Sequence, residues 1–283
     1  MLQKNTKPKH PEAGQSKAVS ADRHLLYQQA VQDVKTEIDF VEQTWSMLRR
    51  CRAEYLREDF CGTANTACEW VRRTDEHHAI GVDLEAEVLD WGRAHNLAQL
   101  NQDQQSRVQL LCEDVRAVNL RPVDIILAMN FSYYLFLTRT DLHEYFANAL
   151  DNLVTDGILF LDAYGGSEAP MDITEPRSCT DEHGENFTYI WEQTEFNPID
   201  SCMTCHIHFE FPDKSRLDNA FSYRWRLWTL PEICEILHEV GFSEVEVYWE
   251  GTDHESNEGN GIYTPATIGD ADPGWVCYIV AQA

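Results

Sequence analysis

Two short segments carry the residue types from which a nucleoside-binding site is built. In Leu56–Ala64, an apolar run ends in acidic residues, Glu58 first, and passes into a turn that contains Gly62. In Gly81–Leu84, a second apolar run ends in Asp83, 21 residues after Gly62. A glycine lets a ligand approach the backbone, and a carboxylate after the next strand can accept hydrogen bonds from ribose hydroxyls. The spacing therefore predicts a strand–helix–strand unit that binds a nucleoside.

Short apolar runs alternate with helical stretches around these two segments. The apolar runs are typical of buried strands and cover Ala53–Leu56, Ala79–Val82, Val108–Leu111, Val123–Met129 and Gly157–Ala163. The helical stretches between them cover Thr66–Arg73, Glu85–Ala98 and Asp141–Leu153. This alternation predicts a parallel sheet with helices on both faces. Ligands bind such sheets at the carboxyl ends of the strands, where the acidic residues above would lie.

A different pattern precedes the alternation. Apolar residues recur at three- and four-residue steps across Ala21–Arg50, which predicts a helical N-terminal cover. Met1–Ser20 is polar and contains Lys4, Lys7, Lys9 and Lys17 without an apolar core. We therefore expect a disordered tail there rather than a secretory signal.

The character of the chain changes again after Gly165. Glu168–Asn186 is rich in Pro, Asp, Glu and Ser and predicts a long loop or lid. Three aromatic-rich runs predict an antiparallel meander: Phe187–Phe196, Cys202–Phe211 and Asn219–Trp228. The remainder predicts a helix over Leu230–Val240, two sheet-closing strands over Glu244–Trp249 and Trp275–Val280, and a polar connection over Gly251–Pro273.

This ordered series of motifs resembles the class I S-adenosylmethionine-dependent methyltransferases. The first motif of that family reads as an acid, any residue, and then three glycines at alternate positions. Here Glu58 takes the acidic place and Gly62 that of the middle glycine, while Phe60 and Ala64 stand where the outer glycines would be. The series continues in order with Asp83, Asp114, Asn130–Ser132, Asp156–Phe160 and Leu230–Phe242, so that the resemblance covers roughly residues 25–283.

The resemblance implies an α/β, Rossmann-like methyltransferase fold. Its sheet would be mainly parallel and seven-stranded, with an antiparallel last strand, an inserted antiparallel cap and an N-terminal helical cover. We expect a single methyltransferase domain over residues 21–283. Its parts would be the cover (21–50), the cofactor-binding core (51–165), the substrate cap (166–229) and the sheet-closing segment (230–283).

The resemblance also implies S-adenosylmethionine as cofactor, with S-adenosylhomocysteine as product. Asp83 would accept from the ribose hydroxyls, Asp114 from the adenine amino group with the Val115 N–H as a donor, and Glu58 would meet the ligand ammonium. The residues expected to bind the cofactor are Tyr27, Glu58, Gly62, Asp83, Leu84, Asp114, Val115 and Asn130. A strand-end Asp is also a common helix cap, which is the structural alternative for Asp83 and Asp114.

Three residues are candidates for contact with the methyl acceptor: Tyr164, His206 and Arg224. Tyr164 follows the fifth strand at the carboxyl edge, His206 shares one strand face with His208, and Arg224 could clamp a carboxylate. For His206 the alternative is a solvated strand face, and for Arg224 and the nearby Arg226 it is pairing with neighbouring Glu residues.

Cys202-Met203-Thr204-Cys205-His206 matches the spacing for covalent haem attachment. Attachment of that kind belongs with export, and the motif falls within an expected strand. Strand alternation sends Cys202, His206 and His208 to one face and Cys205 to the other, which also splits a four-ligand zinc site. We therefore expect no metal.

Composition narrows the classes of partner. The formal net charge of −26 repels phosphate backbones, so we expect no nucleic acid as partner. The sequence contains no run of 18 apolar residues, and we expect no membrane span. Nine scattered Cys without a signal segment favour reduced thiols and a cytoplasmic location. We expect a monomer or a homodimer.

The function expected is methyl transfer to a small molecule, mainly by holding the acceptor in line with the methyl–sulfur bond. A protein or peptide methyltransferase is one alternative, since an acidic surface also suits a basic peptide. A nicotinamide-dependent dehydrogenase is another, although Glu58-Asp59 is hostile to a pyrophosphate. A non-catalytic S-adenosylmethionine-binding protein on the same fold is the third.

Overall fold

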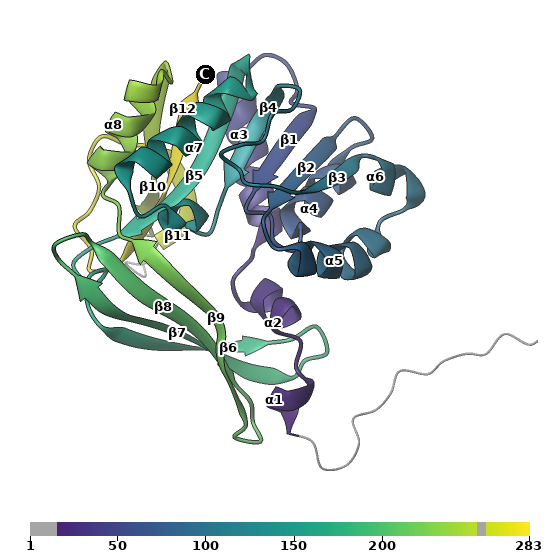
Figure 1. Cartoon of the computed structure of the whole chain (residues 1–283), viewed down its shortest axis with the longest axis vertical. Coiled ribbons are helices and arrows are strands. Elements are labelled where there is room, and N and C mark those ends of the chain that lie inside the picture. Colours follow the sequence, from purple (N-terminus) through teal and green to yellow (C-terminus); the bar gives the residue numbers. More distant parts are fainter. Residues whose placement is uncertain (1–15, 254–258) are drawn as a thin grey trace, which may run out of the picture. The chain divides into compact units, whose positions relative to one another are not determined.

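The computed structural model describes residues 16–253 and 259–283, which form two compact units (Figure 1). The core unit comprises Asp33–Met171, Glu195–Met203 and Arg224–Ala283. The cap unit comprises Asp172–Thr194, Thr204–Tyr223 and the described residues up to Gln32. The cap strands and the described N-terminal residues are thus grouped in a unit of their own. The single domain over residues 21–283 stays a prediction.

The core unit is built on a sheet of eight strands in the order β11-β10-β12-β5-β4-β1-β2-β3. The strands are β1 (Tyr55–Asp59), β2 (His78–Asp83), β3 (Val108–Cys112), β4 (Val123–Ala128), β5 (Leu153–Gly165), β10 (Glu244–Thr252), β11 (Gly259–Pro265) and β12 (Trp275–Gln282). The five neighbouring strands β5, β4, β1, β2 and β3 are parallel to one another. At the other side of β5 the pairing is antiparallel: β12 pairs with β5, β10 with β12, and β11 with β10. The expected Rossmann-like sheet is confirmed, with one strand more than the expected seven.

Helices cover both faces of this sheet, as the alternation predicts. The core helices are α3 (Val34–Leu48), α4 (Asn65–Arg73), α5 (Ala86–His95), α6 (Gln102–Ser106), α7 (Arg139–Asp151) and α8 (Leu230–Val240), with 3₁₀ turns at Leu97–Gln99 and Ser132–Leu135. In Figure 1, α7 and α8 lie in front of the sheet and α3 lies behind it. The α3 face buries Ile38, Trp45 and Trp70 against strand residues such as Leu127 and Phe160.

The extra strand β11 lies in the segment for which the sequence predicts a polar connection. It pairs antiparallel with the edge strand β10, where Trp249 lies opposite Thr264 and Glu250 opposite Tyr263. The Tyr263 ring contacts that of Tyr278 on β12, at 4.6 Å between centroids. A Gly-rich edge strand with one anchoring aromatic residue carries little alternation, and for this reason the sequence pattern does not reveal it.

The cap unit contains a second sheet, in the order β6-β7-β8-β9. Its strands are β6 (Ile173–Thr180), β7 (Asn186–Asn197), β8 (Cys202–Glu210) and β9 (Arg216–Arg226). The meander is confirmed, but β6 occupies part of the expected loop. β6 is almost wholly exposed, so it lacks the apolar alternation of a half-buried strand. Within this unit α2 (Arg23–Ala30) buries Leu26 and Ala30 with Phe209 of β8.

The N-terminal helical cover is interrupted. Instead of one helix over 21–50, α2 ends at Ala30 and α3 begins after Asp33, whose side chain accepts from the Thr36 N–H as an N-cap. Lys17–Ser20, expected to belong to a disordered tail, forms the short helix α1, in which the Lys17 ammonium pairs with Glu185. Residues 1–15 of that expected tail lie outside the described residues.

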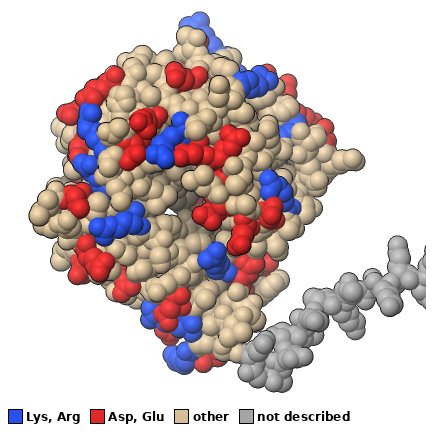
Figure 2. Space-filling model, in the orientation of Figure 1, with Lys and Arg blue, Asp and Glu red and all other residues tan. Residues whose placement is uncertain are grey.

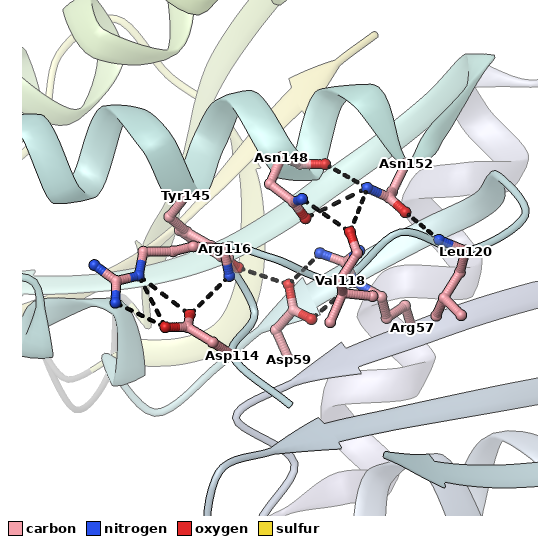
Figure 3. Close-up of polar contacts among 9 residues, drawn as sticks. All are labelled: Arg57, Asp59, Asp114, Arg116, Val118, Leu120, Tyr145, Asn148 and Asn152. Carbon is pink, nitrogen blue, oxygen red and sulfur yellow. Dashed lines mark hydrogen bonds and ion pairs between the residues drawn. The ribbon is translucent and has the colours of Figure 1, made fainter. Parts of the chain in front are cut away.

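A buried ion pair lies on the α7 face of the sheet (Figure 3). β1 extends through Glu58 and Asp59, which the sequence suggested for the following loop. The Arg57 guanidinium meets the Asp59 carboxylate at 2.8 Å through both Nε and Nη2, and the Tyr145 hydroxyl donates to Asp59 at 3.0 Å. Asp59 is thereby neutralised inside the fold, so it adds no charge to the loop beyond the strand.

Removing one partner of this pair is expected to destabilise the protein strongly. Arg57→Leu should lower the free energy of unfolding by about 3–5 kcal/mol, because it leaves Asp59 buried without its cation. Arg57→Leu combined with Asp59→Leu should recover most of that loss, since the uncompensated charge is gone. Urea unfolding measures both. As a control, Arg52→Leu at the exposed Arg52–Glu76 pair should change stability by less than about 1 kcal/mol. A double variant as unstable as Arg57→Leu would contradict the argument.

Candidate functional site

The loop after β1 keeps the backbone of a glycine-rich turn although two of its three glycine positions are replaced. Phe60, Gly62 and Ala64 have φ of 56°, 51° and 56°, all in the left-handed region. For a residue other than glycine this conformation costs roughly 1–2 kcal/mol. Phe60 and Ala64, the two departures from the expected motif, thus adopt the left-handed conformation that glycine favours.

Contacts from α5 hold this loop in place. The Thr63 carbonyl accepts a hydrogen bond from Asn96 Nδ2 at 2.9 Å. Gly92 lies so close that a Cβ there would come within 2.5 Å of the same carbonyl oxygen. A Cβ at Gly62, by contrast, would meet nothing within 4 Å. The loop is thus packed on the side of α5, and Gly62 borders open space that a ligand can enter.

Asp83 ties the ends of β1 and β2 together at the carboxyl edge. Its Oδ2 accepts from the Gly62 N–H at 2.8 Å and its Oδ1 from the Glu85 N–H at 2.9 Å. Burial raises the pKa of this carboxyl above its ordinary value. Leu84, the next residue, is 64% exposed. The structure therefore brings Gly62, Asp83 and Leu84 together, as the sequence predicts, and each Asp83 oxygen has a second lone pair for a ligand.

Glu58 lies on the opposite face of β1 from Arg57 and Asp59. Its Oε2 accepts from the Ala67 N–H, in the first turn of α4, at 2.8 Å. Burial raises the pKa of Glu58 to about 8, and this effect outweighs the hydrogen bond from Ala67. Of the two neighbouring acids, Asp59 is paired with Arg57, whereas Glu58 pairs with no Lys or Arg in the described part of the chain.

Asp114 is engaged by a residue that sequence reasoning missed. Arg116 Nη2 and Nε reach its carboxylate at 2.7 and 3.1 Å, and the Arg116 N–H donates to it at 2.9 Å (Figure 3). These contacts lower the pKa of Asp114. Arg116 also pairs with Asp141 at 2.9 Å. Asp114 and the buried Val115 thus lie after β3 as expected, but the carboxylate is already hydrogen-bonded by the guanidinium.

Asp162, which the sequence analysis did not single out, organises the loop after β4. Its two oxygens accept from the N–H groups of Asn130 and Phe131, at 2.7 and 2.8 Å. Asn130 and Phe131 have φ of 59° and 56°, so the carboxylate holds two consecutive left-handed residues. Burial raises the pKa of Asp162 to about 7. An acid inside the apolar run Gly157–Ala163 was the available signal.

Aromatic rings surround Tyr164 beside this loop. Its ring lies 4.8 Å from that of Phe131, 5.5 Å from Tyr134 and 6.3 Å from Trp225. The Tyr164 hydroxyl reaches Met203 Sδ at 3.8 Å. Tyr134 and Trp225 are buried, whereas Phe131 and Tyr164 are only partly covered. These two rings form an aromatic surface next to the Asp162 clamp.

Glu37, near the start of α3, is a further acid that sequence reasoning missed. Burial, the nearby Asp162 and then Asp33 raise its pKa to about 8. The Glu37 charge in turn raises the pKa of Glu58. The only sequence signal was an acid within the first turn of an amphipathic helix, a position at which acids are common for dipole reasons alone.

The remaining candidates divide between the units. Tyr27 and His206 belong to the cap unit, where the Tyr27 ring packs 5.0 Å from Phe221 and His206 Nδ1 lies 2.8 Å from Ser222 Oγ. Arg224 belongs to the core unit and is exposed on β9. Its neighbour Arg226 pairs with Glu232 at 2.9 Å, which is the structural alternative that the sequence left open.

Two further features bear on the class of protein. In the described parts of the chain, no three His, Cys, Asp or Glu side chains are grouped so that they could hold a metal ion. Within the same residues, no helix has both the length and the apolar character needed to cross a bilayer.

Comparison with known proteins assigns the fold. A methyltransferase from Clostridium acetobutylicum, S-adenosylmethionine-dependent, aligns with a TM-score of 0.64 at 17% identity, covering 91% of this chain and 96% of its own. CalS10, an amino pentose methyltransferase from Micromonospora echinaspora, gives 0.63 at 17%, covering 92% and 95%. KedS8, a sugar N-methyltransferase from Streptoalloteichus, gives 0.63 at 15%, covering 100% and 98%. No family model and no curated protein sequence matches the chain.

The chain therefore has the Rossmann-like fold of the class I S-adenosylmethionine-dependent methyltransferases. In CalS10 the solved structure contains bound S-adenosylmethionine. At 15–17% identity the likeness establishes the architecture, while the roles of individual residues rest on the geometry given above.

The buried Glu58 should make the ligand-free protein less stable as the pH rises. Its pKa is about 8 in the folded chain against 4.5 ordinarily, so between these values the folded state holds a proton that the unfolded state releases. Stability from this group is therefore full below about pH 4.5 and is lost as the pH rises toward 8. Between pH 5.5 and 7.5 the wild type should lose roughly 2 kcal/mol more than Glu58→Gln, as measured by urea unfolding.

Glu87→Gln is the matched control for this experiment, because Glu87 is exposed on α5. It should follow the wild-type slope of stability against pH. A Glu58→Gln slope equal to that of the wild type would show that the carboxyl group is solvated in the folded protein.

Proposed function

We propose that this protein is an S-adenosylmethionine-dependent methyltransferase that acts on a small-molecule acceptor. The observation that carries the proposal is the charge at the carboxyl edge of the sheet. Glu58, Asp83 and Asp162 lie there on three strands, and in the described part of the chain none of them pairs with a Lys or Arg. Such an edge favours a cationic nucleoside over a phosphate.

The electrostatics separate the two cofactor classes that use this kind of fold. A pyrophosphate needs N–H donors and positive charge, whereas a sulfonium and an ammonium are attracted by carboxylates. The raised pKa values of Glu58 and Asp162 mean that these groups resist ionising while the site holds no cation. A positively charged ligand reverses that preference. This argues for S-adenosylmethionine and against a nicotinamide dinucleotide.

The residues at the loop after β1 fit this cofactor. Asp83 would accept hydrogen bonds from the ribose hydroxyls. The ligand would pass close to the backbone at Gly62 and make an apolar contact with the exposed Leu84. Glu58 would accept from the ammonium, and Asn130 and Val115 would border the remaining parts of the ligand. Asp114 would have to accept from adenine while it stays bonded to Arg116. Tyr27 of the cap unit remains a prediction.

Methyl transfer from a sulfonium requires few catalytic groups from the protein. The methyl group is already activated, so the main task is to hold the acceptor in line with the methyl–sulfur bond and to exclude water. Phe131 and Tyr164 offer an aromatic surface for the acceptor, and Asp162 fixes the loop that carries Phe131. A partly positive methyl group and a developing ammonium are both attracted by aromatic faces. His206 and Arg224 are proposed acceptor contacts.

Two observations support a small acceptor, and a third bears on the location of the enzyme. CalS10 and KedS8, by their descriptions, act on an amino pentose and on a sugar nitrogen. All nine Cys are free thiols, which also supports a cytoplasmic enzyme rather than an exported one. The acidic residues on the face drawn in Figure 2 are interspersed with Lys and Arg instead of forming one continuous acidic patch for a basic peptide.

Calorimetric titration tests the cofactor. We expect the protein to bind S-adenosylhomocysteine and not NAD. Gly62→Ala should weaken that binding by at least about ten-fold, because its methyl group enters the ligand space, while left-handed strain lowers stability by only about 1–2 kcal/mol. Gly274→Ala is the control, since a Cβ there also meets nothing within 4 Å but its φ is not left-handed. Binding of NAD without S-adenosylhomocysteine would reject the proposal.

A transfer assay tests the acceptor class. With labelled S-adenosylmethionine, we expect methylation of amine-bearing sugars or related small amines and no methylation of their hydroxyl analogues, because a neutral amine attacks without a general base. A Tyr164→Ala variant should turn over more slowly than the wild type, and binding of S-adenosylhomocysteine should be unchanged. Methylation of basic peptides alone would replace the small-molecule acceptor. Cofactor binding with no turnover on any acceptor would favour a binding protein.

A further inference from the structure

Glu37 presents a buried oxygen that the fold leaves unpaired. The residue lies in the first turn of α3, four residues after the capping residue Asp33, on the helix that packs against the sheet. In the described part of the chain, its Oε2 has no hydrogen-bond partner. A buried carboxyl oxygen without a partner carries a desolvation penalty, so its presence calls for a group that is absent from the protein alone.

The charged groups that raise the pKa of Glu37 are both carboxyl groups, Asp162 and Asp33. The titratable groups that act on it or on its neighbours are Asp33 of α3, Glu58 of β1, Cys61 of the following loop, Asp83 of β2, Asp162 of β5, Tyr263 of β11, and Cys277 and Tyr278 of β12. No Lys, Arg or His of the described chain is among the groups that shift Glu37, Glu58 or Asp162.

Register explains why these groups converge. Asp162 and Tyr278 are directly opposed on β5 and β12, so their side chains point to the same face of the sheet. The Tyr278 ring stacks on Phe40 of α3 at 4.2 Å, one helical turn from Glu37. Glu58 lies on that same face, since it alternates with Arg57 and Asp59. The face beneath the start of α3 thus gathers three carboxyl groups from three elements.

We propose that Glu37, with Glu58 and Asp162, receives the cationic end of the cofactor, and that cofactor binding expels protons from these carboxyl groups into solution. This inference rests on the proposed function. It makes Glu37 a direct contact of the bound ligand, and it makes cofactor affinity depend on pH.

The proton balance follows from the ligand-free protein. The pKa values of Glu37, Glu58 and Asp162 are about 8, about 8 and about 7, so near pH 6.5 these groups are mostly neutral acids. An ammonium or sulfonium placed among them stabilises the carboxylate form. Each acid that ionises gives one proton to the buffer, and its carboxylate pairs with the ligand. Affinity should therefore rise with pH between about 6 and 8.

Calorimetry measures these protons directly. S-adenosylmethionine is titrated into the protein at pH 6.5 in buffers with different ionisation enthalpies. At this pH an α-amino group, with a pKa near about 8, is already protonated, so the ligand itself takes up no proton. We expect the wild type to release at least about one proton per cofactor bound and at most nearly three, since the three acids together hold nearly three protons at this pH. S-adenosylhomocysteine, which lacks the sulfonium charge, should release fewer.

Glu37→Gln isolates the contribution of this residue. Gln has the shape of the neutral acid, so the thermal midpoint of the ligand-free variant at pH 6.5 should match the wild type. The variant should release about one proton fewer and bind S-adenosylmethionine roughly ten-fold more weakly, because a charged hydrogen bond is lost. Glu42→Gln on the same helix, where Glu42 lies 3.6 Å from Arg73, should keep wild-type proton release and affinity.

The outcomes separate the two proposals. Binding of S-adenosylmethionine without proton release by the wild type overturns the inference and leaves the proposed function standing. Equal proton release by Glu37→Gln and the wild type removes Glu37 from the site. Absence of any S-adenosylmethionine binding rejects the proposed function itself, and this inference with it. If Glu37→Gln fails to fold, the buffer dependence of the wild type still decides whether protons are released.

Discussion

Carboxyl side chains that accept backbone N–H groups hold the carboxyl edge of the sheet together. Asp83 accepts from the Gly62 N–H, Glu58 from an N–H in the first turn of α4, and Asp162 from the N–H groups of Asn130 and Phe131 in the loop after β4. Each bond joins a strand end to a neighbouring loop or helix. Buried acids that would otherwise oppose folding thereby define the shape of the site.

The segment Arg57–Asp59 shows how one strand serves two purposes. Alternation along β1 sends Arg57 and Asp59 to the α7 face, where they neutralise each other beside Tyr145. It sends Glu58 to the α3 face, where no Lys or Arg of residues 16–253 and 259–283 pairs with it. The Arg57–Asp59 pair is satisfied within the protein, whereas burial favours the neutral form of Glu58 on the other face. A shift of one residue in this strand would exchange the two roles.

Sequence reasoning reached the parts of the fold and site that depend on local pattern. Alternating apolar runs predicted the parallel sheet, and the spacing of Gly62 and Asp83 predicted their meeting at its edge. It did not identify Glu37, Asp162 and Arg116, because their roles depend on which elements pack together. β6 and β11 were missed for a related reason: exposed edge strands need no apolar alternation, so their pattern resembles that of a loop.

The loop after β1 shows why the motif can diverge while its geometry persists. Glycine lowers the strain of a left-handed backbone, but it does not create the turn. Here Asp83 holds the Gly62 N–H, and the Asn96 side chain and the close approach of Gly92 hold the Thr63 carbonyl. These tertiary contacts offset the strain at Phe60 and Ala64. Of the three positions, Gly62 borders open space, where the proposed cofactor would come close to the backbone. Two proteins can therefore share a fold at 15–17% identity even where residues of the characteristic motif differ.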